Sequence, residues 1–308
     1  MDQCNQRKAH SASKCESFTL DYMRNTACRA DCEIIPDEFE RCIICFTMRN
    51  TIQDNSVTVI IPTYSRVKST VEAVHSALNQ TLKPSRIIVI DDGSPEANFS
   101  DLRTQLAGLP VELIKGEKSS HPGRARNIGL AMSTSQWIAF LDSDDLWKPD
   151  KLKIQIDYAI SQKAQAICTN ASILDGNNSG GILYPSLPRI LTTKTLIKTN
   201  HIINSSVLIS RDLLLQVGGV SAEYSVRGVE DYSTWLKISK FVNWHVINEP
   251  LVLYAQFSED SIRIGSQLNY YSRVYAWLDY SSWSKNYFGE KQLLTRIILK
   301  MLSISIGK

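Results

Sequence analysis

The stretch Trp137–Asp145, WIAFLDSDD, joins a continuous apolar run to three carboxylates. An apolar run without polar alternation is typical of a strand that is buried on both faces, as in parallel sheets. Such sheets bind ligands just beyond the carboxyl ends of their strands, which is where these carboxylates fall. The stretch therefore predicts an α/β fold with a polar site at the end of a central strand.

Three similar apolar runs precede this strand, and segments of helix length separate them. The predicted strands are Val57–Ile61, Arg86–Ile90 and Val111–Ile114. The predicted crossover helices are Ser69–Gln80, a segment ending at Leu106, and Gly123–Met132. Strands that alternate with helices in this way predict a mostly parallel central sheet with helices on its faces.

The pattern is less regular after the acidic stretch. Lys151–Lys163 has an apolar face at helical spacing, and Asp150 precedes it in the position of a helix cap. The later predicted elements are a strand at Ser206–Ile209, a helix around Tyr232–Phe241, and strands at Trp244–Ile247 and Leu251–Tyr254 with a turn between them.

Composition excludes several classes of protein. Of the 308 residues, 43% are hydrophobic and 21% are charged, which excludes a disordered chain, a collagen and a coiled coil. The formal charge of +3 gives no reason to expect a nucleic-acid partner. No apolar run reaches the about 18 residues of a membrane span, and the N-terminus lacks the apolar core of a signal peptide. We therefore expect a soluble, cytoplasmic protein.

Two acidic clusters follow predicted strands. Asp91-Asp92-Gly93-Ser94 comes directly after one strand and is either a ligand-binding loop or a plain acidic turn. Asp142-Ser143-Asp144-Asp145 follows the next one, and three carboxylates so close together repel one another unless a cation is present. Mn²⁺ or Mg²⁺ fits, because such ions take oxygen ligands and bridge one or two carboxylates to a diphosphate. The alternative is a cluster that caps the next helix.

Two further groups add candidate site residues. Arg124 and Arg126 open a predicted helix, whose free amide groups attract phosphates, although surface arginines are usually only solvated. Glu230 and Asp231 head another helix, where acids stabilise the helix dipole. If this pair faces the same cleft as the acidic clusters, it supplies a general base.

Together these motifs resemble the family 2 glycosyltransferases, whose GT-A fold is Rossmann-like with a mostly parallel central sheet. The resemblance covers about Ser56 to Tyr254. It is carried in order by VTVIIPTYSR (Val57–Arg66), IIVIDDGS (Ile87–Ser94), GRARNIGLA (Gly123–Ala131), FLDSDDLWKPDKL (Phe140–Leu152) and GVEDYSTWLK (Gly228–Lys237).

The resemblance implies a donor site for a nucleotide-sugar, which we expect to be UDP-linked. It places Pro62 and Tyr64 at the base, Asp92 at the uracil or ribose, and Arg126 near the phosphates. Asp142, Ser143 and Asp144 correspond to the DxD element, in which Asp144 coordinates the catalytic metal.

The resemblance further implies an inverting transfer to an acceptor hydroxyl in a polysaccharide, lipopolysaccharide or glycoprotein glycan. Asp231 corresponds to the catalytic base, with Glu230 beside it. Many relatives have a basic residue or histidine after the last strand where this chain has Phe257, so Arg263 or His245 is a substitute cation. The alternatives are a nucleotidyltransferase and a non-catalytic, zinc-stabilised interaction module on a transferase-like scaffold.

The N-terminal 50 residues differ from the rest because they contain six of the seven cysteines. Cys28, Cys32, Cys42 and Cys45 form two closely spaced pairs, a pattern typical of tetrahedral zinc sites. Free thiols and disulfides are the alternatives. We predict a small cysteine-rich module at residues 1–50, with structural zinc as its first interpretation.

The C-terminal region is predicted to be helical. From Lys285 to Lys308 five basic residues and one acidic residue surround a broad apolar stripe. Such a helix packs on its own domain, or contacts the inner face of a membrane or a partner. The predicted organisation is thus a module at 1–50, a glycosyltransferase domain at 51–265 and an amphipathic helical region at 266–308.

Overall fold

The structure, a computed structural model, describes residues 55–118, 121–175, 178–255 and 268–288. All of them belong to one unit, Asn55–Lys308. The strands of this described part are β1 (Val57–Thr63), β2 (Arg86–Asp91), β3 (Glu112–Lys115), β4 (Trp137–Phe140), β5 (Leu146–Trp147), β6 (Ala166–Asp175), β7 (Asn178–Ile182), β8 (Ile190–Leu191), β9 (Leu208–Ser210) and β10 (Trp244–Tyr254). The helices are α3 (Val67–Leu78), α4 (Glu96–Gln105), α5 (Pro122–Met132), α6 (Lys151–Gln162), α7 (Thr193–Lys198), α8 (Arg211–Gln216), α9 (Glu230–Ile238) and α10 (Leu268–Phe288).

One sheet contains these strands in the order β3-β2-β1-β4-β9-β6-β10-β5, with β7 beside β6 and β8 beside β10. The pairs β1–β2, β2–β3 and β1–β4 are parallel, as is β6–β10. The short strand β9 runs antiparallel between β4 and β6. The prediction of an α/β fold with a mostly parallel central sheet is therefore confirmed, and β1, β2, β4 and β10 end at the same edge.

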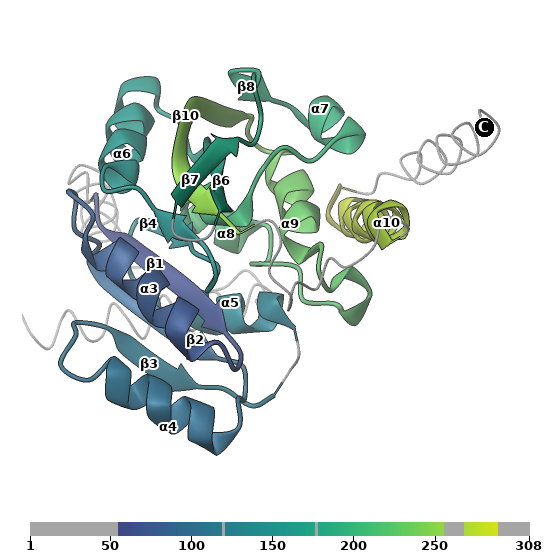
Figure 1. The fold of residues 1–308 in the computed structure, drawn as a ribbon. Coiled ribbons are helices and arrows are strands. Elements are labelled where there is room, and N and C mark those ends of the chain that lie inside the picture. The colour runs from purple at the N-terminus through teal and green to yellow at the C-terminus, as the bar shows by residue number, and fades with distance from the viewer. Residues whose placement is uncertain (1–54, 119–120, 176–177, 256–267, 289–308) are drawn as a thin grey trace, which may run out of the picture. The chain divides into compact units, whose positions relative to one another are not determined.

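Alternation along β1 separates two cores. Val57, Val59 and Ile61 pack into a core with α3 and α6, whereas Ile60 faces a second core with α5 and α9. Figure 1 shows α3 and α5 on opposite faces of the sheet. Both faces of this strand are thus covered, which explains why its run is nearly all apolar. The one polar residue between Val57 and Ile61 is Thr58, which is buried and donates to Ser135 Oγ at 2.8 Å.

Two predictions about elements need correction, and one strand was missed. The strands predicted at Trp244–Ile247 and Leu251–Tyr254 are one strand, β10, whose register with β6 shifts on either side of Pro250. The long strand β6 was not predicted. Asp150 occupies the N-cap position of α6 without capping it through its side chain, because that carboxylate accepts a hydrogen bond from Thr81 Oγ1 at 2.9 Å.

The helix α10 falls in the region predicted to be helical and packs against α9. Trp277 Nε1 donates to Tyr232 Oη at 2.8 Å, and Lys237 Nζ forms an ion pair with Asp279 at 2.8 Å. The apolar stripe of the predicted basic helix lies in residues 289–308, outside the described residues, so its membrane contact stays a prediction. No helix in the described ranges is long and apolar enough to cross a bilayer.

Candidate active site

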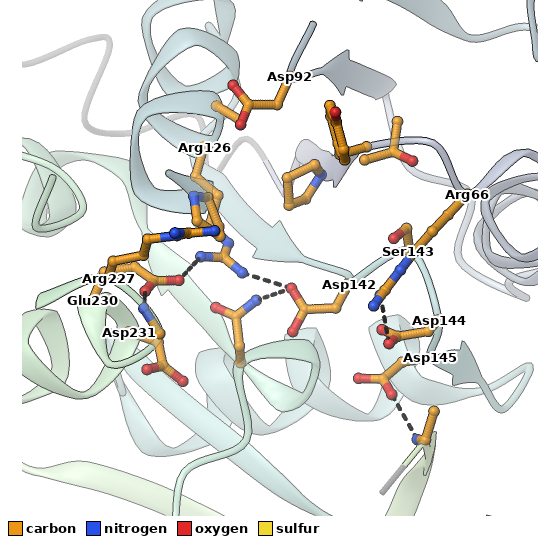
Figure 2. Close-up of a pocket in the computed structure, with 18 of the residues that line it drawn as sticks. Arg66, Asp92, Arg126, Asp142, Ser143, Asp144, Asp145, Arg227, Glu230 and Asp231 are labelled. Atoms are coloured by element: carbon orange, nitrogen blue, oxygen red, sulfur yellow. Dashed lines mark hydrogen bonds and ion pairs between the residues drawn. The ribbon is translucent and has the colours of Figure 1, made fainter. Parts of the chain in front are cut away.

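A pocket of about 620 Å³ lies at the edge where β1, β2, β4 and β10 end. Its walls include every site residue predicted on the glycosyltransferase resemblance: Pro62, Tyr64, Asp92, Arg126, Asp142, Ser143, Asp144, Glu230 and Asp231. Figure 2 shows the acidic residues from three separate segments around this pocket. The fold thus brings together residues that are up to 169 positions apart, from Pro62 to Asp231.

The first acidic cluster divides into a structural and an accessible carboxylate. Asp91 is buried, and its side chain accepts hydrogen bonds from the backbone N and the hydroxyl of Ser94. Gly93 has a φ of 78°, a left-handed conformation that glycine adopts without strain. Asp92 lines the pocket, and its Oδ2 accepts a hydrogen bond from His121 N at 3.2 Å. Asp91 therefore closes the loop that presents Asp92.

The second cluster, Asp142–Asp145, forms a turn that we call the acidic turn. Asp142 Oδ1 accepts hydrogen bonds from Arg126 Nη2 and Asn204 Nδ2, both at 2.7 Å. Asp144 Oδ2 forms an ion pair with Arg66 Nη1 at 2.6 Å. The repulsion expected among these carboxylates is thus reduced by two arginines from different elements.

Asp145 has a different role from its neighbours. Its side chain is buried and accepts hydrogen bonds from Ser205 Oγ at 2.5 Å and from Ala255 N at 2.8 Å. Burial, followed by the charges of Asp142 and Asp144, raises the pKa of Asp145 well above its usual value. Asp145 therefore ties the end of β10 to the acidic turn.

The pair at the start of α9 lies on another wall of the pocket. Both oxygens of Glu230 are engaged: Oε1 by Arg126 Nη1 and Oε2 by Gly228 N, each at 2.7 Å. Asp231 is also largely buried, and its Oδ1 accepts a hydrogen bond from Tyr232 N at 2.7 Å. Glu230 is thus fixed by an arginine and a backbone amide, and Asp231, beside it in the pocket lining, is the candidate base that the resemblance implies.

Arg126 links the two acidic walls (Figure 2). Its side chain is 5% exposed and forms ion pairs with Asp142 and Glu230. Burial lowers the pKa of Arg126, but the charges and hydrogen bonds of the two carboxylates outweigh this effect and raise it. Arg126 is therefore a permanent cation that neutralises both walls, whereas Arg124 is exposed on the same helix.

The structure adds pocket residues that sequence reasoning missed. Arg66, Lys118 and Arg227 contribute cations to the lining. His245, one predicted substitute cation, is not one of the residues that line the pocket; its ring packs against Tyr158 near the start of β10. That prediction is wrong because the pocket lies where β10 ends. Arg263 and Phe257 lie outside the described residues.

Asp144 and Asp142 are the residues that fit a divalent cation. Both carboxylates line the pocket and are part-exposed, at 21% and 30%. Within the described residues, no group of three or more His, Cys, Asp or Glu side chains is arranged to hold an ion. The protein therefore supplies one or two carboxylates. This suits a hard cation such as Mn²⁺ or Mg²⁺, whose other ligands are water and the phosphate oxygens of a substrate.

The predicted zinc ligands Cys28, Cys32, Cys42 and Cys45 lie outside the described residues, so the zinc site stays a prediction. Cys168 of β6 is buried as a free thiol, and burial raises its pKa to about 12. This residue therefore packs as a neutral apolar group.

A mostly parallel sheet with an acidic turn and a carboxylate pair at one edge is the arrangement expected of the GT-A fold. The sequence profile described as Glycosyl transferase family 2 matches residues 58–218, about half of the chain. The chain belongs to this family.

A curated relative agrees with the family, and solved structures agree with the fold. UDP-Glc:alpha-D-GlcNAc-diphosphoundecaprenol beta-1,3-glucosyltransferase WfgD of Escherichia coli is 29% identical over 203 residues, covering 64% of this chain and 75% of WfgD. The crystal structure of S. aureus TarS with UDP-GlcNAc matches with a TM-score of 0.60 at 16% identity, covering 79% of this chain and 71% of the TarS chain. A Pyrobaculum calidifontis mannosyltransferase, PcManGT, solved with GDP-Man and Mn²⁺, matches with a TM-score of 0.50 at 16% identity over 81% of this chain and 80% of its own.

Several relatives are much longer than this chain. It covers 27%, 48% and 36% of the lengths of proteins from Rickettsia bellii, Rickettsia felis and Rickettsia conorii, each described as an uncharacterized glycosyltransferase.

Proposed function

We propose that this chain transfers a sugar from a UDP-linked donor to an acceptor hydroxyl, with inversion and with a divalent metal as cofactor. The acceptor is a glycan, a glycolipid or a glycoprotein in surface polysaccharide, lipopolysaccharide or glycoprotein glycan synthesis. The observation that carries the proposal is the single pocket lined by both the acidic turn and the Glu230–Asp231 pair.

The relatives support the class of donor. WfgD is named for UDP-glucose, and TarS was solved with UDP-GlcNAc. The nucleotidyltransferase alternative leaves Glu230 and Asp231 without a chemical task, although both line the pocket. The inactive-scaffold alternative is disfavoured because the chain retains Asp92, Asp142, Asp144 and Asp231.

Residues on one wall of the pocket act on the acceptor, and residues on the other wall act on the leaving diphosphate. Asp231 accepts the proton of the acceptor hydroxyl as that oxygen attacks the anomeric carbon. The bond from the anomeric carbon to the diphosphate oxygen breaks on the opposite side, and the diphosphate leaves with the electron pair. One displacement of this kind inverts the anomeric configuration. Arg126 holds Glu230 in place next to the base.

The leaving-group wall is the acidic turn. Asp144, with Asp142 beside it, would hold Mn²⁺ or Mg²⁺, which supplies Lewis-acid neutralisation of the charge on the departing diphosphate. The Mn²⁺ reported in PcManGT supports this choice of cofactor. Asp92 and Tyr64 line the pocket on the side expected to bind the nucleoside.

A calorimetric titration of UDP, GDP and TDP, with and without Mn²⁺, tests the donor assignment. We expect UDP to bind more tightly than the other two nucleotides, and more tightly with Mn²⁺ than without it. Tighter binding of GDP or TDP would mean that the donor carries that nucleotide in place of UDP. The absence of binding by all three would overturn the proposed function.

Asp231→Asn tests the base. The substitution keeps the size of the side chain and removes its ability to accept a full proton, so we expect transfer to fall by about 10²-fold or more while UDP binding is retained. Release of UDP from UDP-glucose or UDP-GlcNAc, with and without added acceptor, measures the loss. Asp101→Asn, on an exposed residue of α4, is the matched control. Near-normal transfer by Asp231→Asn would place the base on another residue.

A further inference from the structure

Many relatives have a basic residue or histidine after the last strand, and this chain has Phe257 there. Arg66 is a cation in the pocket that comes from another part of the chain, the loop after β1. Its guanidinium extends from this loop toward the acidic turn, on the same side of the pocket, and pairs with Asp144 Oδ2 at 2.6 Å (Figure 2). Both side chains remain about one fifth exposed, at 22% and 21%. An ion pair with this exposure exchanges partners more readily than a buried one, because water screens and replaces each charge.

The backbone that presents Arg66 is held in an unusual conformation. Ser65, directly before it, has a φ of 54°, in the left-handed region that residues with a side chain rarely adopt. Ser65 N donates to Ser94 Oγ at 2.8 Å, and Thr70 Oγ1 donates to Arg66 O. Local strain of this kind persists where the surroundings fix it and is concentrated at functional sites. The strain here points to a requirement on where Arg66 lies.

The other described cations of the pocket are placed differently. Arg126 is buried between two carboxylates. Lys118 is exposed and lies over the Tyr64 ring, with Nζ 5.2 Å from the ring centroid. Arg227 is exposed in the loop before Glu230. Among these four cations, Arg66 is the one paired with the carboxylate that we assign to the metal.

We propose that Arg66 has two partners in succession: Asp144 in the free enzyme, and the diphosphate of the leaving nucleotide once Asp144 is bound to a divalent cation. This inference rests on the proposed function. A guanidinium keeps its proton at all working pH values and matches two phosphate oxygens with its planar fork. Arg66 thus holds Asp144 in its place before binding and stabilises the negative charge of the diphosphate during transfer.

Arg66→Gln separates the two roles because they predict effects of opposite sign. Without its competitor, Asp144 should bind Mn²⁺ alone about 2-fold to 5-fold more tightly, the range expected for releasing a part-exposed ion pair. UDP with saturating Mn²⁺ should bind at least about 10-fold more weakly, because a charge-assisted hydrogen bond is lost. Electron paramagnetic resonance of free Mn²⁺ measures the first quantity, and calorimetry measures the second.

Arg124→Gln is the matched control, since it removes the same charge from an exposed arginine that does not line the pocket. Both affinities should stay within about 2-fold of the unsubstituted protein in this variant, because the Arg124 side chain is exposed and water and salt screen its charge. Arg66→Lys should retain part of the UDP affinity as a point charge without the fork.

The outcomes separate this inference from the proposed function. If the unsubstituted protein binds no UDP with Mn²⁺, the proposed function fails and Arg66 loses its second partner. If it binds UDP and Arg66→Gln leaves that affinity unchanged, only the assignment of Arg66 is overturned. Weaker binding of both Mn²⁺ and UDP to Arg66→Gln would also overturn it, because Arg66 would then merely shape Asp144.

Discussion

Two carboxylates of the acidic turn, Asp142 and Asp144, make the same kind of contact in different surroundings. Arg126 binds Asp142 at 2.7 Å, and Arg66 binds Asp144 at 2.6 Å. The side chain of Arg126 is 5% exposed, whereas that of Arg66 is 22% exposed. Distance does not distinguish the two pairs, and Asp142 is itself 30% exposed. The arginines differ, because Arg126 is buried and also pairs with Glu230, whose side chain is 5% exposed. The Arg126 pair is a fixed part of the scaffold, whereas the Arg66 pair can exchange partners.

The largest difference between the two pairs should be in stability. Arg126→Gln leaves Asp142 and Glu230 without their shared cation, so we expect a loss of about 3–5 kcal/mol in the free energy of unfolding. Arg66→Gln breaks a part-exposed pair, and we expect a loss of about 1 kcal/mol or less. Urea denaturation at neutral pH, followed by tryptophan fluorescence, measures both. Equal losses for the two variants would contradict the distinction between a fixed and an exchangeable pair.

Asp144→Asn should change binding more than stability. The variant keeps the shape of the turn but removes the metal-binding charge, so the gain in UDP affinity on adding Mn²⁺ should shrink by about 10-fold to 100-fold, the scale of losses at metal sites. UDP binding without metal should be retained or strengthened, because Arg66 is released from its carboxylate. Calorimetry with and without Mn²⁺ shows both effects, with Asp101→Asn as the control. An unchanged response to Mn²⁺ would move the metal away from Asp144.

The sequence predicted the first half of the fold better than the second. The strands β1, β2 and β4 are near-continuous apolar runs because both of their faces are covered. β1 and β4 lie between the two large cores, and β2 lies between one of these cores and a smaller cluster with Ala125 of α5. The strand β6 was missed because its centre is polar. Asn170 is buried there with its Nδ2 bonded to Tyr184 O at 2.7 Å, a partner 14 residues away. A polar residue satisfied by a distant backbone group leaves no periodic signal in the sequence.

The acidic residues of the site and Arg126 were predictable, whereas the other described cations of the pocket were not. These are Arg66, Lys118 and Arg227. Asp142, Asp144 and Asp231 stand next to strand ends or helix starts, so local sequence places them. Arg66 was inside a quoted motif, but its contact with Asp144 spans 78 residues and depends on the conformation of Ser65. Motifs therefore located the carboxylates, while the charge balance among them needed the three-dimensional structure.

Lys151 is a buried basic residue that, unlike Arg126, forms no ion pair with a carboxylate among the described residues. Its side chain is 0% exposed, Nζ donates to Gln155 Oε1 at 2.6 Å, and the same atom lies 4.1 Å from the centroid of the Trp147 ring. Burial lowers the pKa of Lys151 well below its usual value. Arg126, by contrast, stays charged because two carboxylates surround it.

The smallest expected effect is a pH dependence of stability that Lys151 causes. The folded pKa is below the unfolded one, so the unfolded chain binds more protons, and stability rises with pH between these two values. Relative to Lys151→Met, the unsubstituted protein should gain stability from pH 7 to pH 9, by no more than about 1.4 kcal/mol per pH unit, the limit for one proton. Urea denaturation at pH 7, 8 and 9 tests this, with Lys153→Met on the exposed face of α6 as the control. A pH-independent difference would mean that Lys151 stays charged through its contact with Trp147, so that burial alone does not decide the state of a cation here.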